Sequence, residues 1–194
     1  MTDTVSQPEI REVNRIVVRF AGDSGDGMQL TGERFTSASA LFGNDLATLP
    51  EFPAEIRAPQ GTLAGVSAFQ VQVSDHDITT PGDAPNVLVA MNPAALKNEL
   101  SKLEEAGTII VNRDTFEERN LKKAGYEDNP LETGELSGYT LFEVPMTSLT
   151  KEVCKGIEGI KPRDAERSKN FFALGLVSWL YQRPLEPTLD WIEK

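Results

Sequence analysis

The sequence is poor in the side chains that build metal centres and covalent cross-links. Among its 194 residues there is one cysteine, Cys154, and one histidine, His76. A disulfide, a zinc cage and an iron–sulfur cluster each need several such ligands, so the chain alone can build none of them. It also shows no Walker loop and no nucleophile paired with a base. We therefore expect no metal site and no catalytic residue in this chain, and a reducing compartment.

Positive charge is scarce as well. Lys and Arg together number 19 and Asp and Glu number 30, which gives a net charge of −11. Proteins whose main partner is nucleic acid need a basic face, so we expect no nucleic-acid partner. The acidic surplus favours solubility.

Long apolar runs are absent. No segment approaches the roughly 20 apolar residues that a membrane-spanning helix requires. The opening residues, MTDTVSQPEIRE, are polar and acidic, unlike a signal peptide. We expect a soluble, cytoplasmic protein without membrane contact, and interpret residues 1–14 as a flexible tail. With 39% hydrophobic and 25% charged residues, the remainder can bury one core.

Strand-like and helix-like segments alternate along the chain. This order predicts an α/β fold: a single Rossmann-like domain with an open, mostly parallel, doubly wound sheet. Alternating polarity in Val66–Val73 predicts a strand with one wetter face. The predicted strands are Arg15–Ala21, Leu46–Leu49, Val66–Val73, Asn86–Met91, Thr108–Val111 and Thr140–Val144. The predicted helices cover residues 28–42, 93–106, 116–124, 146–155 and 168–181, followed by a short one capped by Thr188.

A glycine-rich loop, GDSGDG, follows the first predicted strand. Gly22, Gly25 and Gly27 let the backbone turn tightly and approach a ligand, and Ser24 adds a hydroxyl donor. The next helix directs free N–H groups and its positive dipole end at the same place, which suits a phosphate or pyrophosphate. Asn92, a good N-cap followed by proline, leaves another strand at the same edge of the sheet, where such folds bind ligands.

The loop also has a second interpretation. Its spacing is G-x-x-G-x-G and not the G-x-G-x-x-G of dinucleotide-binding folds. Asp23 and Asp26 place negative charge beside the proposed phosphate, unless one or both cap the helix. The glycines could instead serve only the close packing of helix on strand, and the sequence leaves both interpretations open.

A second candidate segment runs from Phe52 to Gly65, where Arg57 is placed to grip a carboxylate or phosphate. Pairing of Arg57 with Glu51 or Glu55 is the alternative. Three weaker candidates have ordinary explanations. His76 lies between two aspartates and is expected at the surface, and Cys154 is expected to be a half-buried, inert thiol. The basic stretch Lys161, Arg163, Arg167 and Lys169 either forms a solvated face or contacts a phosphate or an acidic partner.

Three segments together carry a family resemblance. They are FAGDSGDGMQLTGERF (residues 20–35), LPEFPAEIRAPQGTLAGVSAFQVQV (49–73) and VLVAMNPAAL (87–96). In this order they resemble the γ domain of 2-oxoacid:ferredoxin oxidoreductases, most closely the version fused to the N-terminus of the α subunit in 2-oxoglutarate:ferredoxin oxidoreductase. The resemblance extends from about Arg15 to Lys194.

The resemblance implies a function that the residues alone do not. The family converts a 2-oxoacid, coenzyme A and oxidised ferredoxin into acyl-CoA, carbon dioxide and reduced ferredoxin. It implies coenzyme A at the glycine loop Gly22–Gly27, with Arg57 and Asn92 at characteristic positions. Thiamine diphosphate, Mg²⁺ and the iron–sulfur cluster are expected elsewhere in the complex. The γ domain would act as a mobile cover and docking domain, with the thiamine-binding α domain, the β subunit and ferredoxin as partners.

We accordingly assign residues 15–185 to the γ-type domain and 186–194 to the start of a linker or helix towards a following domain. Two other functions remain as alternatives. One is a nucleotide-dependent dehydrogenase, for which Asp45 would be the acidic residue that binds the ribose. The other is a structural interaction domain whose glycine loop binds no ligand.

Overall fold

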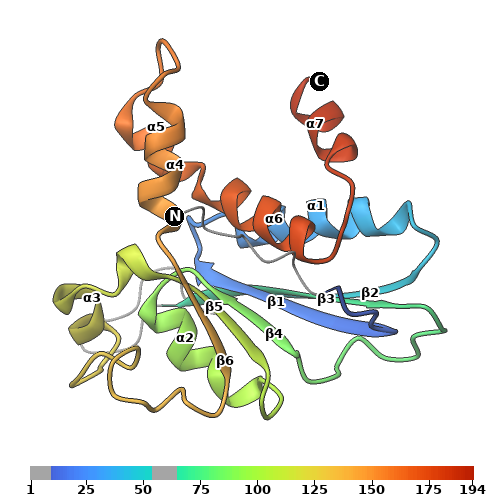
Figure 1. The fold of residues 1–194 in the computed structure, drawn as a ribbon, viewed down its shortest axis with the longest axis horizontal. Coiled ribbons are helices and arrows are strands. Elements are labelled where there is room, and N and C mark those ends of the chain that lie inside the picture. Colours follow the sequence, from blue (N-terminus) through green and yellow to red (C-terminus); the bar gives the residue numbers. More distant parts are fainter. Residues whose placement is uncertain (1–9, 54–64) are drawn as a thin grey trace, which may run out of the picture.

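The computed structural model describes residues 10–53 and 65–194, which form one six-stranded mixed sheet (Figure 1). The strand order is β2-β3-β1-β4-β5-β6. β1 pairs in parallel with β4, β4 with β5 and β5 with β6, whereas β3 is antiparallel to both β1 and β2. The strands are β1 (Arg15–Asp23), β2 (Asp45–Glu51), β3 (Val66–Ser74), β4 (Val87–Ala90), β5 (Thr108–Asn112) and β6 (Thr140–Val144).

Helices cover both faces of this sheet. In Figure 1, α1 and α6 lie along one face, and α2 and α3 lie on the other. This arrangement confirms the predicted α/β fold with a mostly parallel, doubly wound sheet. The helices are α1 (Met28–Ala40), α2 (Pro93–Glu99), η1 (Leu100–Lys102), η2 (Arg113–Thr115), α3 (Glu118–Lys123), α4 (Met146–Cys154), α5 (Pro162–Arg167), α6 (Lys169–Leu180) and α7 (Glu186–Ile192).

The central strand β1 separates two hydrophobic cores. Val18 and Phe20 face α1 and α6, and the ring of Phe20 meets that of Phe35 edge-on at 5.9 Å between centroids. Ala21, on the opposite face, packs with Leu96 of α2. β-Branched and aromatic residues suit a strand that is covered on both sides, which is why this run forms the middle of the sheet.

The prediction that one face of β3 is the wetter one is wrong, because the polar residues of this strand are buried. Gln70 and Gln72 are each 3% exposed. The Gln70 amide donates to the carbonyl oxygens of Pro81 and Asp83, and that of Gln72 donates to the Asp83 carboxylate. The segment between β3 and β4 therefore covers this face and supplies hydrogen bonds in place of water.

Arg19 of β1 lies beside these glutamines and is 1% exposed. Its guanidinium contacts Glu99 at the end of α2 and Glu51 at the end of β2, each at 2.5 Å. Lys102 completes the cluster, with its ammonium 3.0 Å from Glu51 and 3.1 Å from Glu99. Burial of an arginine in a central strand is tolerated here because two carboxylates compensate its charge.

The C-terminal helices differ from prediction in two respects. α7 begins at Glu186, so Thr188 is a buried residue inside the helix and not its N-cap. Pro187 is compatible with this earlier start, because the first helical turn needs no N–H donors. The basic stretch that begins at Lys161 contains a short helix, α5, which sequence analysis did not predict.

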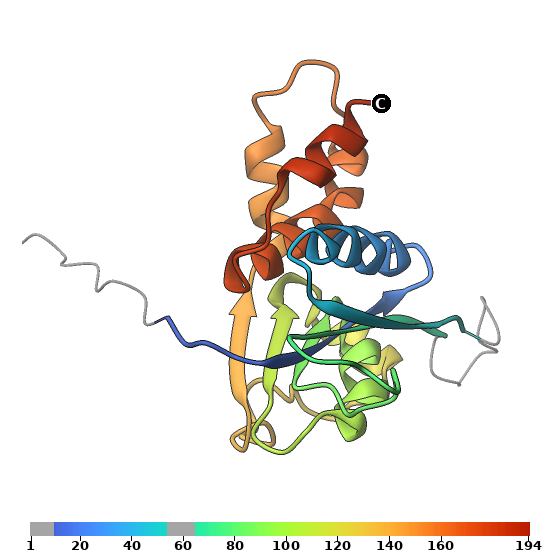
Figure 2. The same ribbon diagram turned by 90° about the vertical axis from the view of Figure 1, so that its right-hand side faces the viewer.

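α4, α5 and α7 extend away from the sheet, beyond the layer formed by α1 and α6 (Figure 2). α6 buries Ala173, Leu174 and Val177, but Trp179 on its other side is 65% exposed. α7 contacts α1, where the Arg34 guanidinium stacks 4.6 Å above the Trp191 ring. Within the described residues, no helix is long and apolar enough to cross a membrane.

Candidate functional site

The candidate site lies where two neighbouring parallel strands end. β1 and β4 are hydrogen-bonded neighbours, yet the chain leaves β1 into α1 on one face and leaves β4 into α2 on the other (Figure 1). The diverging connections open a crevice at the carboxyl ends of the strands. Ligands bind at such a switch point in open α/β sheets.

The glycine loop forms one wall of the crevice. The N–H of Asp26 donates to the carbonyl oxygen of Asp23, which closes the turn at 2.9 Å. Gly27 is the N-cap of α1 with a φ of 74°, a left-handed conformation that favours glycine. Because Gly27 has no side chain and makes no side-chain cap, neither aspartate caps α1 in the way that the sequence allowed.

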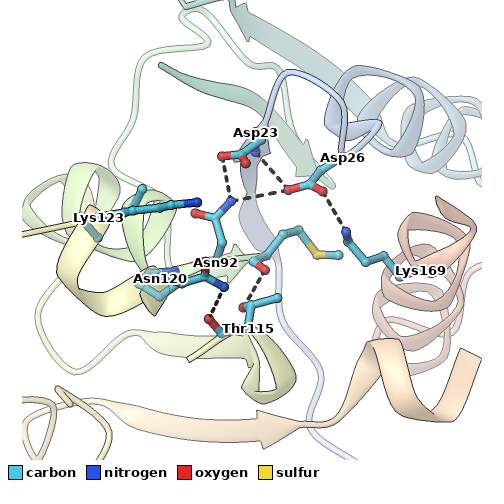
Figure 3. A pocket seen from close by; sticks show the side chains of 11 residues that line it. Asp23, Asp26, Asn92, Thr115, Asn120, Lys123 and Lys169 are labelled. Carbon is cyan, nitrogen blue, oxygen red and sulfur yellow. Dashed lines mark hydrogen bonds and ion pairs between the residues drawn. The ribbon is translucent and has the colours of Figure 1, made fainter. Parts of the chain in front are cut away.

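The two aspartates instead cluster with Asn92, as Figure 3 shows. The Asn92 amide donates to a carboxylate oxygen of Asp23 at 2.9 Å and, more weakly, to Asp26 at 3.4 Å. Its own oxygen accepts the N–H of Ala95 at 2.8 Å, which confirms Asn92 as the N-cap of α2. One side chain thus begins α2 and holds the loop carboxylates beside it.

Two lysines flank this cluster from opposite sides (Figure 3). The Lys169 ammonium lies 2.9 Å from Asp26, and both side chains are largely buried, at 16% and 12% exposure. Lys123 comes from the end of α3. Two carboxylates and two ammonium groups therefore meet in one crevice, which pairs acceptors for hydroxyl or amine groups with cations for phosphate.

The charge balance changes the acidity of Asp23. Although Asp23 has an exposed surface, partial burial of its carboxyl in the crevice raises its pKa, and the neighbouring Asp26 carboxylate raises it further. The hydrogen bond from Asn92 and the charges of Lys169 and Lys123 act in the opposite direction. The net rise means that Asp23 takes up a proton more readily than a free aspartate.

The crevice encloses a cavity of about 230 Å³. Thr115 and Asn120 close its far side, since Thr115 donates to the carbonyl oxygens of Met91 and Asn112, and Asn120 donates to that of Thr115. The cavity is open to solvent and has room for one end group of a larger ligand. It is lined by Asp23, Asp26, Met91, Asn92, Pro93, Ala94, Thr115, Asn120, Lys123, Ala124 and Lys169.

The structure brings together three of the predicted site residues, namely Asp23, Asp26 and Asn92. Ser24 and Gly25 lie at the exposed tip of the loop and do not line the cavity. Gly22 and Gly27 shape the loop behind the carboxylates. Arg57, with most of the predicted loop from Phe52 to Gly65, lies outside the described residues.

Sequence reasoning missed Lys123, Asn120 and Thr115 as lining residues. A signal for Thr115 was available, because it follows β5 and the carboxyl ends of neighbouring parallel strands share one edge. Nothing local marks Lys123 or Asn120, because their position depends on how α3 packs. Lys169 was noticed only as part of a basic stretch, and it alone of that stretch lines the cavity.

The weaker candidates behave as ordinary residues. His76 is exposed and its ring nitrogen lies 2.7 Å from Asp75, which confirms a surface position. Cys154 is a half-buried free thiol. Among residues 10–53 and 65–194, no group of three or more His, Cys, Asp or Glu side chains is placed to hold a metal ion.

Comparison with protein families gives one match along most of the chain. Residues 17–194 match the family described as pyruvate ferredoxin/flavodoxin oxidoreductase. The chain is 60% identical over 179 residues to 2-oxoglutarate oxidoreductase subunit KorA of Mycobacterium tuberculosis, covering 92% of this chain and 27% of that protein. It is 31% identical over 137 residues to 2-oxoglutarate synthase subunit KorC of Methanothermobacter marburgensis, covering 70% of this chain and 66% of that subunit.

Solved structures give the same picture. A 2-oxoglutarate:ferredoxin oxidoreductase from Magnetococcus marinus, with 2-oxoglutarate, coenzyme A and succinyl-CoA bound, matches with a TM-score of 0.63 and 26% identity, over 86% of this chain and 24% of that one. The γ subunit of a keto/oxoacid ferredoxin oxidoreductase from Geobacter sulfurreducens shares the fold, with a TM-score of 0.57 and 19% identity, over 84% of this chain and 75% of that subunit. The chain thus spans about a quarter of the length of the KorA relative and of the Magnetococcus chain.

Proposed function

The chain belongs to the pyruvate ferredoxin/flavodoxin oxidoreductase family, and on this premise we propose that it is the coenzyme A-binding component of a 2-oxoglutarate:ferredoxin oxidoreductase. The observation that carries the proposal is the crevice at the switch point, where Lys169 and Lys123 flank the glycine loop. The coenzyme A named in the Magnetococcus enzyme and the 2-oxoglutarate named in the KorA relative support the choice of ligand and substrate.

In the proposed reaction, a 2-oxoacid is decarboxylated, its acyl group is transferred to the thiol of coenzyme A, and two electrons pass to oxidised ferredoxin. Thiamine diphosphate with Mg²⁺ supplies the electron sink for decarboxylation, and an iron–sulfur cluster carries the electrons. By the family resemblance, we propose that both groups lie in the α domain and β subunit that would be the partners of this chain.

The role of this chain is then positional. Phosphate groups of coenzyme A would bind at Lys169 and Lys123 beside the loop Gly22–Gly27, and Asn92 and Asn120 would donate hydrogen bonds. The cavity of about 230 Å³ accepts one end of so long a molecule, and the open side lets the remainder extend towards the partner. Holding the thiol near the reacting carbon and covering it from water lowers the barrier without any catalytic residue here.

A nucleotide-dependent dehydrogenase fits the geometry less well. In dinucleotide-binding folds the ribose-binding acid ends a strand beside β1. Here the neighbour of β1 on that side is the antiparallel β3, and Asp45 starts the outermost strand β2. Both carboxylate oxygens of Asp45 already accept backbone N–H groups, from Leu46 and Ile78.

The proposal is tested by calorimetric titration of the chain with coenzyme A and, separately, with NAD. We expect binding of coenzyme A and none of NAD. Ser24→Asp adds negative charge at the tip of the loop and should weaken the binding, whereas Ser37→Asp, the same change on the exposed surface of α1, should preserve it. Absence of coenzyme A binding both to the chain and to the assembled enzyme would favour the structural interaction domain.

A further inference from the structure

The Asp26 carboxylate occupies the position in the crevice that an incoming anion would use. One of its oxygens accepts the backbone N–H of Asp23 at 2.9 Å, and the other pairs with the Lys169 ammonium at 2.9 Å. A loop N–H and a lysine ammonium are the donors with which glycine loops hold phosphate. Both are already engaged by a negative group of the chain itself.

Two glycines of the loop make room for side chains of the site, and one of these side chains is the internal anion Asp26. A Cβ at Gly22 would lie 2.8 Å from the Asp26 carboxylate oxygen, so any other residue at position 22 would push that carboxylate away. A Cβ at Gly27 would lie 2.7 Å from the side-chain nitrogen of Asn170, next to Lys169. In contrast, a Cβ at Gly25 would meet no atom within 4 Å. Two of the three glycines therefore accommodate side chains of the protein itself.

Lys169 is the first residue of α6, which packs along α1. Its pairing with Asp26 consequently links the loop to α6, as the close-up in Figure 3 shows. The side chains of Lys169 and Asp26 are 16% and 12% exposed and are thus shielded from water. The Asp26 carboxylate therefore attracts the Lys169 ammonium more strongly than a surface carboxylate would, and competes more strongly with an incoming anion.

We propose that Asp26 is a specificity-determining residue: its carboxylate competes with the anionic group of a ligand for Lys169 and the Asp23 N–H. The proposal rests on the proposed function in that the same crevice receives coenzyme A. A tethered carboxylate competes at a high effective concentration, so a small free anion displaces it only with a large loss of affinity. A ligand with further contacts along the crevice compensates for this loss, and the site thereby favours a large phosphorylated molecule over inorganic phosphate.

The test is titration of the full chain with inorganic pyrophosphate, a probe without further contacts. Asp26→Asn keeps an oxygen for the Asp23 N–H but frees Lys169, so pyrophosphate affinity should rise by about tenfold or more. Asp45→Asn is the matched control, because it removes the same charge from the distant strand β2, and it should change the affinity less than about twofold. Unchanged or weaker pyrophosphate binding by folded Asp26→Asn would overturn the proposal.

A second variant keeps the proposal testable should Asp26→Asn fold poorly. Lys169→Met leaves the Asp26 carboxylate without its cation, and pyrophosphate binding should fall below that of the unmodified chain. In the double variant that carries both Asp26→Asn and Lys169→Met, the gain in pyrophosphate affinity that Asp26→Asn gives alone should disappear, because the Lys169 ammonium is no longer present. A gain that persists without Lys169, or a Lys169→Met variant that binds as the unmodified chain does, would contradict the assigned competition.

Titration with coenzyme A separates this inference from the proposed function. Tighter pyrophosphate binding by Asp26→Asn, with no coenzyme A binding by any form, would support competition by the Asp26 carboxylate and contradict the proposal that coenzyme A is the ligand. Coenzyme A binding, with no effect of Asp26→Asn on pyrophosphate affinity, would support coenzyme A as the ligand and contradict the proposed competition.

Discussion

Gly32 of α1 packs directly against Phe69 of β3. A Cβ at this position would approach the Phe69 ring to 2.1 Å, which no buried side chain can accommodate without a shift. Gly32 thus sets the distance between helix and sheet. At the loop, Gly22 and Gly27 allow close approach of Asp26 and Asn170. All three glycines allow a close approach because they lack a Cβ. Gly32 serves the packing of α1 on the sheet, whereas Gly22 and Gly27 serve the candidate site.

We expect Gly32→Ala to lower the free energy of unfolding by about 1–3 kcal/mol, because the added methyl group forces the Phe69 ring or α1 to move. Urea denaturation followed by circular dichroism measures the change. Gly25→Ala is the matched control, since its Cβ meets open space, and it should cost less than about 0.5 kcal/mol. Equal losses in the two variants would show that glycine flexibility, and not contact with Phe69, is responsible.

The raised pKa of Asp23 predicts a pH dependence of stability. In the folded state Asp23 binds its proton more tightly than in the unfolded chain. This contribution stabilises the fold fully below the ordinary aspartate pKa and is lost as pH rises through the higher folded value. Asp23→Asn removes the charge, so the variant should gain stability relative to the unmodified chain at pH 7.

That gain should shrink as pH falls towards the ordinary aspartate pKa, because Asp23 itself then becomes neutral. Urea denaturation of both proteins at several values between pH 4 and 7 checks the expectation. A difference that is constant over this range would mean that the carboxyl group has the same pKa in both states.

At the scale of elements, the buried charge cluster joins the end of α2 to the middle of β1 and the end of β2. Arg19 contacts Glu99, the last residue of α2, while Asn92 caps the beginning of the same helix. α2 is therefore held at both ends, at one by a buried ion pair and at the other by a hydrogen bond inside the site. Such a cluster does not by itself imply extra stability, because desolvation of the charges offsets their attraction.

Arg19→Met should destabilise the fold by about 3 kcal/mol, because Glu99 then stays buried with only Lys102 as its partner. Glu99→Leu in the same chain should restore much of the loss, since a neutral side chain needs no compensating charge. A double-mutant cycle by urea denaturation gives the coupling between the two residues. A coupling near zero would show that Arg19 acts mainly through Glu51 and Gln70.

At the scale of the whole molecule, α6 buries one side and presents Trp179 on the other. The sequence predicted an apolar helix covered on most sides, by its own core, by a partner, or by both. In the structure of this chain, only one side of α6 is covered by other elements, which supports the proposed role as a docking domain. The family relationship supports this role, because the relatives are subunits of 2-oxoglutarate oxidoreductases and synthases.

The proposed docking predicts a change in the environment of Trp179. The chain has two tryptophans, so Trp191→Phe leaves Trp179 as its single indole fluorophore. Its emission should shift to shorter wavelength, and quenching by acrylamide should weaken, when the chain assembles with the thiamine-binding part of the enzyme. Trp179→Phe, which leaves Trp191 of α7 as the single fluorophore, is the control. An unchanged Trp179 spectrum in a complex confirmed by size-exclusion chromatography would place the interface elsewhere.

The sequence by itself determined the features that depend on neighbours along the chain. Strand β6 covers Thr140–Val144 as predicted, Asn92 and Pro93 begin α2, and Gly43 follows α1 with a φ of 74°. The order of these elements determined the mostly parallel, doubly wound sheet, and the glycine loop pointed to the edge where the cavity lies. Local hydrogen bonds and side-chain periodicity suffice for such features.

The tertiary structure alone decided which side chains share the crevice. Lys123, Asn120 and Lys169 reach it from α3 and α6, far along the chain from Asp23, and their approach depends on helix packing. The buried polar face of β3 and the partners of Arg19 likewise follow from contacts across long separations. A one-dimensional pattern records the polarity of Gln70 or Asp26 but not what covers or pairs with it, and burial and pairing determine their energies.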